Sequence, residues 1–182
     1  MNLKMKKKEL AIPGAFEILS PFSVDQRGAF VKVLHAHSFS EAGLASSFLE
    51  SYYSTSGKGV VRGMHFQIPP HDHSKLVYAV AGEVMDVLLD LRKTSKAYRD
   101  FVTLTLYHEK RNAVYIPNGV AHGFMVKSDS ATLVYMTTTE YHADSDTGVL
   151  WSSFGLDWGI ENPKVSDRDM GFISLNEFDS PF

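Results

Sequence analysis

Short runs of strand-forming residues, separated by glycine and proline turns, make up most of this chain and leave little helical periodicity. Within residues 83–91, Asp86 and Asp90 alternate with apolar residues such as Val87, so the apolar face is expected to lie in a core. Similar runs occur at residues 29–34, 48–54, 60–67, 76–80, 101–107, 113–116, 122–126 and 132–138. This series predicts an all-β sandwich or barrel. A jelly roll is favoured, because this architecture protects the edges of its sheets in a chain of this size.

One short helix is predicted early in the chain. Ser38 or Ser40 would cap it, and Glu41 would lie in its first turn before residues 42–45. From Trp151 onward the sequence is irregular, which indicates a surface wrap or lid rather than further strands.

Composition narrows the class of protein. With 182 residues, 44% of them hydrophobic, the chain can bury one sizeable core, so we expect a single domain over residues 1–182 with residues 1–9 as a flexible tail. The net charge of −3, with both signs interspersed, argues against nucleic-acid binding. The absence of cysteine excludes disulfides and thiolate chemistry and fits a reducing cytoplasm. No apolar run reaches the length of a membrane span.

Charged and titratable residues interrupt the predicted strand that contains Arg62 and His65, and Lys75 immediately precedes the next predicted strand. Because unpaired charge is costly inside a sheet, this pattern points to a site. Strict alternation places Arg62 and His65 on opposite faces, so both can face inward only if the strand bulges, which Gly63 permits. Alone, His65 could be a core histidine, but the presence of Lys75 and a second histidine, His122, favours a site.

Residues 116–124 have the form Pro-x-Gly-x-x-His and resemble the second motif of cupins, with His122 at the start of a strand. Cupins often bind a metal, and His71 and His73 supply a His-x-His pair. No acidic residue follows four or five positions later, and the ammonium of Lys75 would repel a divalent cation. We therefore expect no metal.

Tyr135 and Asp169 complete the candidate set. Tyr135 shares a strand face with Leu133 and Thr137, so it could be core packing, or it could donate a proton because a reference pKa of about 10 keeps tyrosine protonated at neutral pH. Asp169 could be a turn former, or it could orient a histidine ring. Together these residues could take a proton from carbon, hold an enolate and return a proton.

Eight blocks together resemble the dTDP-4-dehydrorhamnose 3,5-epimerase family, a cupin-type jelly roll, or double-stranded β-helix, without a metal. They are residues 59–67, 75–77, 82–84, 86–87, 90–92, 116–124, 135–138 and 166–169. They follow the family order over nearly the whole chain. The resemblance implies an all-β fold with short helices and an irregular C-terminal segment, and a homodimer that exchanges N-terminal strands.

The resemblance also implies an activity: inversion of C3, C5 or both in a nucleotide-diphosphate 4-keto-6-deoxyhexose, in deoxysugar and cell-surface polysaccharide biosynthesis, with no cofactor. His65 matches the general base and Asp169 its carboxylate partner. Tyr135 matches the proton donor on the opposite face of the sugar, and Lys75 the cation beside the C4 oxygen. Substrate contacts are implied for a further set: Arg27, Arg62, Gln67, His122 and Tyr141.

Several positions depart from the family pattern, including Trp151-Ser-Ser153 and Trp158-Gly159, where the family usually has Trp-Asn-Asp and Trp-Pro. The family commonly has an acidic residue where this chain has Lys32, and a Gln-x-Asn pair where it has Glu50 and Tyr52. We expect these three residues to contact the substrate and to alter which sugar nucleotide is accepted. The alternatives are a single-centre epimerase or a 3,4-ketoisomerase on a CDP-, GDP- or dTDP-linked sugar, and a non-catalytic sugar-binding cupin.

Overall fold

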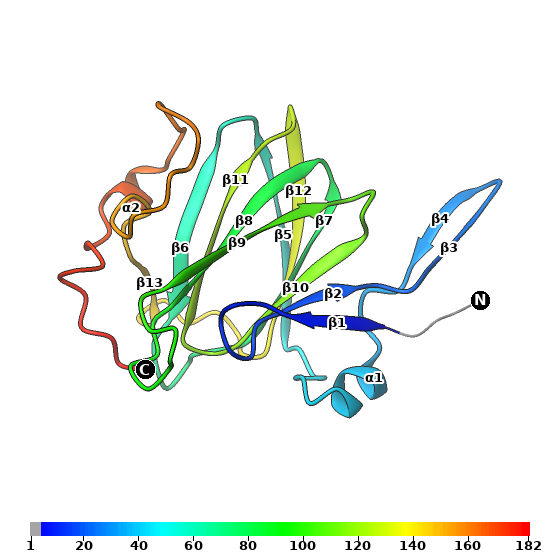
Figure 1. The fold of residues 1–182 in the computed structure, drawn as a ribbon, viewed down its shortest axis with the longest axis horizontal. Helices are drawn as coiled ribbons and strands as arrows, with labels where there is room; N and C mark the ends of the chain where they lie inside the picture. The colour runs from blue at the N-terminus through cyan, green and yellow to red at the C-terminus, as the bar shows by residue number, and fades with distance from the viewer. Residues whose placement is uncertain (1–4) are drawn as a thin grey trace.

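The computed structural model describes residues 5–182 as two facing antiparallel sheets with a projecting hairpin (Figure 1). The larger sheet has the order β1-β2-β10-β7-β12-β5, the smaller β13-β6-β11-β8-β9, and β3-β4 form the hairpin. The strands are β1 (Lys6–Glu9), β2 (Phe16–Leu19), β3 (Phe22–Asp25), β4 (Gly28–Val31), β5 (Glu50–Gly57), β6 (Val61–Gln67), β7 (Lys75–Ala81), β8 (Glu83–Asp90), β9 (Phe101–Tyr107), β10 (Asn112–Ile116), β11 (Val120–Val126), β12 (Ser130–Thr137) and β13 (Asp146–Gly148). The helices are α1 (Ala36–Glu41) and α2 (Asp167–Met170), and neither helix of the described part could cross a membrane.

The main core lies between the two sheets. Val77 and Leu133 from the larger sheet pack in one cluster with Leu88 and Phe124 from the smaller, and all four are almost fully buried. Burial of such side chains is the main driving force for closing the sandwich. The predicted all-β jelly roll is confirmed.

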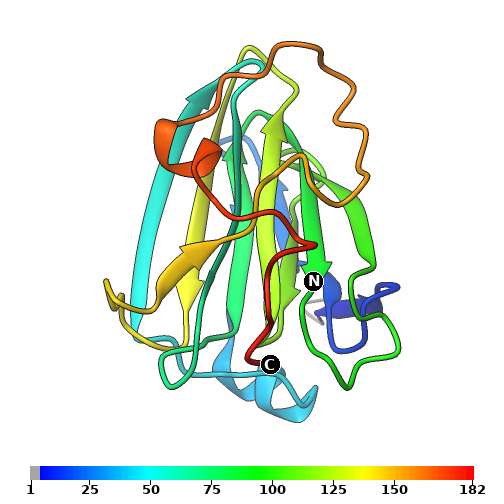
Figure 2. The same cartoon turned by 90° about the vertical axis from the view of Figure 1, so that its left-hand side faces the viewer.

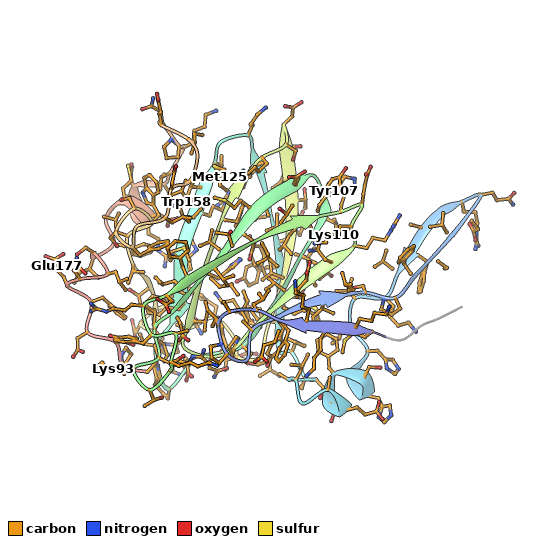
Figure 3. The ribbon with its side chains drawn as sticks, in the orientation of Figure 1. Lys93, Tyr107, Lys110, Met125, Trp158 and Glu177 are labelled. Carbon is orange, nitrogen blue, oxygen red and sulfur yellow. The ribbon has the colours of Figure 1, made fainter. Side chains whose placement is uncertain are left out.

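Two further clusters cover the outer faces. Met125 and Trp158, labelled in Figure 3, belong to the cluster in which the C-terminal segment packs on the smaller sheet. Figure 2 shows this orange-to-red segment running across that sheet. On the larger sheet, Phe39 from α1 packs with Ile18 and Leu76. The irregular segment predicted from Trp151 onward is therefore a wrap, although it contains the short helix α2.

All nine predicted strands are present, with ends shifted by a few residues. Strands β1, β2, β3 and β13 were not predicted, since three or four residues show too little alternation to indicate a strand. The expected tail over residues 1–9 is wrong for Lys6–Glu9, which pair with β2 at the edge of the larger sheet. Residues 1–4 lie outside the described part of the chain.

The predicted helix caps are also wrong. Helix α1 begins at Ala36, so Ser38 and Ser40 lie inside it and Glu41 is its last residue. The residue at the N-cap position is His35, which makes no side-chain cap hydrogen bond. Burial of Phe39 holds the helix instead, so tertiary packing outweighs the capping signal.

The sequence predicts one buried apolar face for β8, but both faces of this strand are buried. β8 lies between β11 and β9, and the clusters on its two sides enclose Leu88 and Val87 respectively. Asp86 and Asp90 are 0% exposed. Asp90 pairs with Arg92 at 2.6 Å, whereas Asp86 faces the interior and pairs with a histidine described below.

The predicted bulge in β6 is present. His122 and Phe124 of β11 pair with His65 and Arg62 of β6, so two steps along one strand match three along the other. Gly63, with φ of 130°, lies at the extra residue.

Gly63→Ala should destabilise the fold by about 3 kcal/mol or more. A Cβ at this position would lie 2.5 Å from Cα of Gly123 and 2.9 Å from the carbonyl oxygen of His122, and backbone cannot move aside cheaply. Urea denaturation measures the loss. Gly28→Ala is the matched control, since φ is 118° there but a Cβ would meet nothing within 4 Å. Equal losses at the two glycines would contradict the role assigned to the close backbone approach.

Candidate active site

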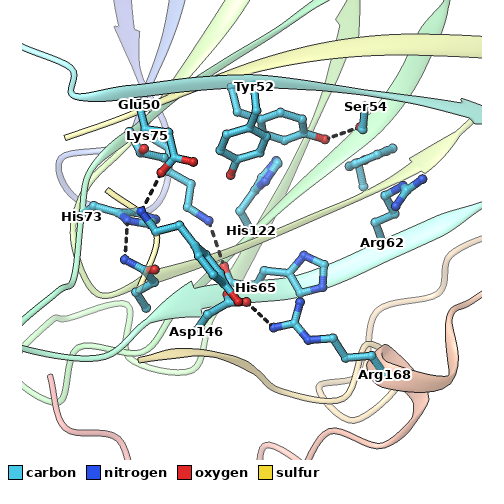
Figure 4. Close-up of a pocket in the computed structure, with 15 residues that line it drawn as sticks. Glu50, Tyr52, Ser54, Arg62, His65, His73, Lys75, His122, Asp146 and Arg168 are labelled. Atoms are coloured by element: carbon cyan, nitrogen blue, oxygen red, sulfur yellow. Dashed lines mark hydrogen bonds and ion pairs between the residues drawn. The ribbon is translucent and has the colours of Figure 1, made fainter. Parts of the chain in front are cut away.

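A cavity of about 330 Å³ opens between the sheets, and β5, β6, β7, β11, β12, β13 and α2 contribute side chains to it (Figure 4). Nine of the twelve candidate residues from the sequence line this cavity: Glu50, Tyr52, Arg62, His65, Gln67, Lys75, His122, Tyr135 and Tyr141. A tenth, Asp169, lies behind His65 and contacts its ring. The first and last of these residues, Glu50 and Asp169, are more than 100 positions apart in the sequence.

The bulge in β6 turns both Arg62 and His65 toward the cavity. Nε of Arg62 donates to Oγ of Ser56 at 2.9 Å, which steadies the guanidinium at one side of the cavity. Figure 4 places Arg62 and Arg168 on the side away from Glu50 and His73. The cavity therefore has a cationic side that suits an anionic group.

His65, whose side chain is 29% exposed, forms a pair with the buried Asp169. Nε2 of His65 lies 2.9 Å from Oδ1 of Asp169, whose Oδ2 accepts from the backbone N–H of Gly63 at 2.9 Å. Burial would raise the pKa of Asp169, but the hydrogen bonds from His65, Gly63 and Ser166 outweigh it and lower this pKa. Burial lowers the pKa of His65, and the bond to Asp169 opposes this without cancelling it. His65 is thus neutral and oriented at neutral pH, as a general base must be.

Lys75 is a buried cation beside this pair. The side chain is 6% exposed, and Nζ donates to the carbonyl oxygen of His65 at 3.4 Å. Burial lowers the pKa of Lys75 to about 8, against the opposing charges of Asp146 and Asp86. An ammonium with so few protein partners can stabilise negative charge that forms on a ligand oxygen.

Tyr135 enters the cavity from the larger sheet, opposite the strand that carries His65. Its ring stacks on Tyr52 with centroids 4.9 Å apart, and its hydroxyl lies 3.0 Å from Oγ of Ser54. Burial raises the pKa of Tyr135 strongly, so the phenol keeps its proton. Partial burial, with the charges of Glu50 and Asp146, raises the pKa of Tyr52 to about 12.

His122 forms a second histidine–aspartate pair, with Asp86, and this one is buried. Nε2 of His122 lies 2.7 Å from Oδ2 of Asp86, and both side chains are at most 4% exposed. Burial raises the pKa of Asp86, although His122 and Lys75 oppose it. The sequence placed Asp86 on the polar face of a half-buried strand, so its part in the site was missed.

Gln67, Glu50 and Tyr141 shape the rim of the cavity. The amide of Gln67 donates to the carbonyl oxygen of His71 at 2.8 Å and accepts from the backbone N–H of His142 at 2.7 Å, which joins two loops. Glu50 accepts from the backbone N–H of Tyr141 at 2.6 Å. Gln67 is therefore a loop anchor as well as a lining residue.

The structure does not bring Arg27 and Lys32 to the cavity of their own chain. Arg27 lies in the turn of the β3–β4 hairpin, where it pairs with Asp25 at 2.6 Å and its side chain is 84% exposed. Lys32 follows the hairpin and lines a separate hollow next to α1. Both remain predictions for this site.

Several lining residues were not selected from the sequence. Ser54 shares the parity of Glu50 and Tyr52 on β5, a signal that could have found it. Asp146 and Arg168 form an ion pair of 2.6 Å at the rim, and only tertiary structure brings them together.

Among residues 5–182, no three histidine or acidic side chains converge in a way that could hold a metal ion. The ring of His71 stacks on His142 with centroids 3.7 Å apart. Nδ1 of His73 contacts Gln67 and Thr139, and burial, with Lys75, lowers the pKa of His73 to about 3. Both histidines of the His-x-His pair therefore contact neighbouring side chains of the protein.

A family model described as dTDP-4-dehydrorhamnose 3,5-epimerase matches residues 9–177. The chain is 41% identical over 160 residues to the dTDP-4-dehydrorhamnose 3,5-epimerase of Shigella flexneri, which covers 85% of this chain and 88% of that protein. The chain belongs to the dTDP-4-dehydrorhamnose 3,5-epimerase family.

Two further comparisons bear on substrate and outcome within this family. The dTDP-4-dehydrorhamnose 3-epimerase of Streptomyces niveus is 36% identical over 176 residues, covering 95% of this chain and 85% of that protein. A crystal structure of a dTDP-6-deoxy-D-glucose-3,5-epimerase from Legionella pneumophila in complex with dTDP-4-keto-L-rhamnose superimposes with a TM-score of 0.91 at 32% identity, covering 96% of this chain and 95% of the other.

Lys75→Met should raise the free energy of unfolding at pH 7 by about 3 kcal/mol, because a pKa lowered from 10.5 to about 8 means that folding disfavours the charged form. Between these two pH values the unfolded chain binds more protons, so the wild type gains stability as the pH rises. The difference between variant and wild type should therefore shrink toward pH 10.5 in urea titrations. Lys58→Met, in an exposed turn, should change stability by less than about 0.5 kcal/mol. A difference that stays constant with pH would contradict the burial of a charged Lys75.

Proposed function

We propose that this protein inverts C3 and C5 of a dTDP-linked 4-keto-6-deoxyhexose, as a dTDP-4-dehydrorhamnose 3,5-epimerase. The observation that carries this proposal is the arrangement of His65, Lys75 and Tyr135 in one cavity, with base and acid on facing sheets. A base and an acid on opposite sides of a sugar ring are what inversion requires.

In the proposed reaction, the 4-keto group acidifies the hydrogens at C3 and C5. His65, oriented by Asp169, takes one proton, and the electron pair of the C–H bond moves onto the C4 oxygen as an enolate. Lys75 stabilises that oxygen. Tyr135 then protonates the carbon from the opposite side, and the carbonyl re-forms with the centre inverted. Solvent then takes the proton from His65 and returns one to Tyr135, so that both groups regain their starting states.

The remaining candidate residues would bind the substrate. Arg62 and His122 would contact the diphosphate and the sugar respectively, and Tyr141 and Gln67 would shape the rim. Glu50 and Tyr52 line the cavity, and this supports the proposal that these two departures from the family pattern change which sugar nucleotide is accepted. No step needs a metal or a redox cofactor, and the cysteine-free chain suits the cytoplasm.

We further propose that the active form is a homodimer. The β3–β4 hairpin projects from the body (Figure 1) and exposes Phe22, Val24 and Phe30 by 46%, 61% and 60%. Apolar exposure of this kind is typical of an interface. A second chain would give Arg27 and Lys32 access to a cavity that they do not reach in their own chain.

The number of inverted centres is the main alternative. The Streptomyces niveus relative is named a 3-epimerase, and its similarity to this chain is close to that of 3,5-epimerases. A single-centre epimerase or a 3,4-ketoisomerase would use the same enolate. A non-catalytic sugar-binding module would bind the nucleotide sugar without exchanging its hydrogens.

The test is hydrogen exchange in D₂O with dTDP-4-keto-6-deoxyglucose, followed by NMR at C3 and C5 in the presence of a chelator. We expect deuterium and inversion at both carbons. His65→Asn should reduce exchange about 10²–10⁴-fold, because the base is lost. Exchange at C3 alone would favour the 3-epimerase, and no exchange on dTDP-, CDP- or GDP-linked sugars would refute an epimerase. Loss of turnover on chelation would refute the metal-free mechanism.

Tyr135→Phe should separate exchange from inversion. His65 alone can remove a proton and return deuterium on the same face, so exchange should persist while inversion falls about 10²-fold or more. NMR of the recovered sugar measures both in one sample. Ser54→Ala, which removes only the hydroxyl partner of Tyr135, is the control and should lower inversion much less. Equal loss of exchange and inversion in Tyr135→Phe would assign Tyr135 to substrate positioning.

A further inference from the structure

Two histidine–aspartate pairs face the same cavity from neighbouring strands. His65 of β6 and His122 of β11 are direct partners in the register of the smaller sheet. Each ring contacts one carboxylate through Nε2, at 2.9 Å for Asp169 and 2.7 Å for Asp86. The chemical groups are the same, so any difference between the pairs must come from their surroundings.

The surroundings of the two carboxylates differ in one respect that decides their charge. Both oxygens of Asp169 have hydrogen-bond partners, His65 and the backbone N–H of Gly63. Asp86 uses Oδ2 for His122, but its Oδ1 is buried and has no partner within residues 5–182. An ionised carboxylate with a buried, unpartnered oxygen is costly, whereas a protonated carboxyl loses less there.

Groups on the neighbouring strands act on the second pair as well. Lys75 on β7 favours an ionised Asp86, but Lys75 is also shared with Asp146 on β13. Tyr135 on β12 presents a neutral ring edge-on to His122, with centroids 6.1 Å apart. His65 on β6 is neutral, since burial lowers its pKa. Burial therefore remains the largest influence on Asp86, and it raises the pKa of this carboxyl.

We propose that Asp86 is a positioning residue that acts through His122: the pair shares one proton between Oδ2 and Nε2 and carries a second proton on Nδ1, so that His122 presents an N–H to the cavity. The inference rests on the proposed function. The two pairs then have opposite tasks. The His65 pair holds one proton fewer and accepts a proton from carbon, while the His122 pair donates a hydrogen bond to the oxygen that becomes negative.

The same amide substitution at the two aspartates should give opposite results. An asparagine at position 86 can donate from Nδ2 to Nε2 of His122 and keep the proton on Nδ1, as a protonated carboxyl does. Asp86→Ala should lower kcat about 10²-fold with little change in KM, and Asp86→Asn should restore most of that loss. Asp169→Asn is the matched control and should lose about 10²–10³-fold, because His65 needs a carboxylate. An Asp86→Asn variant as impaired as Asp86→Ala would overturn the proposal.

A second measurement reads the protonation of His122 directly in the wild-type protein and does not depend on turnover. Two-bond ¹H–¹⁵N correlation spectra of the wild-type protein with labelled histidine report which ring nitrogens of His122 carry protons, with His122→Phe used for assignment. We expect a protonated Nδ1 at neutral pH, and an unprotonated Nδ1 would refute the inference. The losses from Asp86→Ala and His122→Phe should also be non-additive. If the wild type epimerised no sugar nucleotide, the proposed function would fail while the spectrum still decided the proton.

Discussion

The close contact between the backbones of β6 and β11 sets the geometry on which the rest of the site depends. Gly63 and Gly123 approach so closely that a Cβ on either would overlap the other strand. This contact accommodates the extra residue of the β6 bulge. Without the bulge, strand alternation would turn either Arg62 or His65 away from the cavity. One local irregularity thus places an anion-binding group and a proton acceptor on the same surface.

The interior of the sandwich buries charged side chains, which are rarely buried without partners, and the arrangement of partners controls what each group does. Asp169 has both oxygens satisfied, Asp86 has one left bare, and Lys75 has only a distant carbonyl oxygen besides two carboxylates in its field. The unsatisfied oxygen of Asp86 and the buried ammonium of Lys75 reduce the stability of the fold at neutral pH, whereas the lowered pKa of Asp169 adds to it. Their retention in a cavity is the expected signature of a site that moves protons.

The C-terminal segment contributes both to the core and to the candidate site. Its apolar side chains, including Trp158 and Leu175, are buried against the outer face of the smaller sheet. This packing holds α2 against β6, where Ser166 caps the helix and Asp169 reaches His65 and Gly63. A segment without sheet structure therefore supplies the carboxylate of the proposed base, as well as Arg168 at the rim of the cavity.

The sequence alone determined the class of fold, nine of the strands and most of the candidate site, because these depend on short-range signals: alternation, turn glycines and blocks such as Arg62 to Gln67. The bulge at Gly63 could be foreseen for the same reason. Tertiary structure alone decided which partners these residues have. Asp86 is polar by alternation but fully buried by the strands beside it, and Asp146 meets Arg168 only after two loops pack together. The contribution of Lys6–Glu9 to a sheet also depends on pairing with a strand that is itself four residues long. Such contacts join residues far apart in the chain, and no local pattern encodes the distance between two side chains once the sheets have closed.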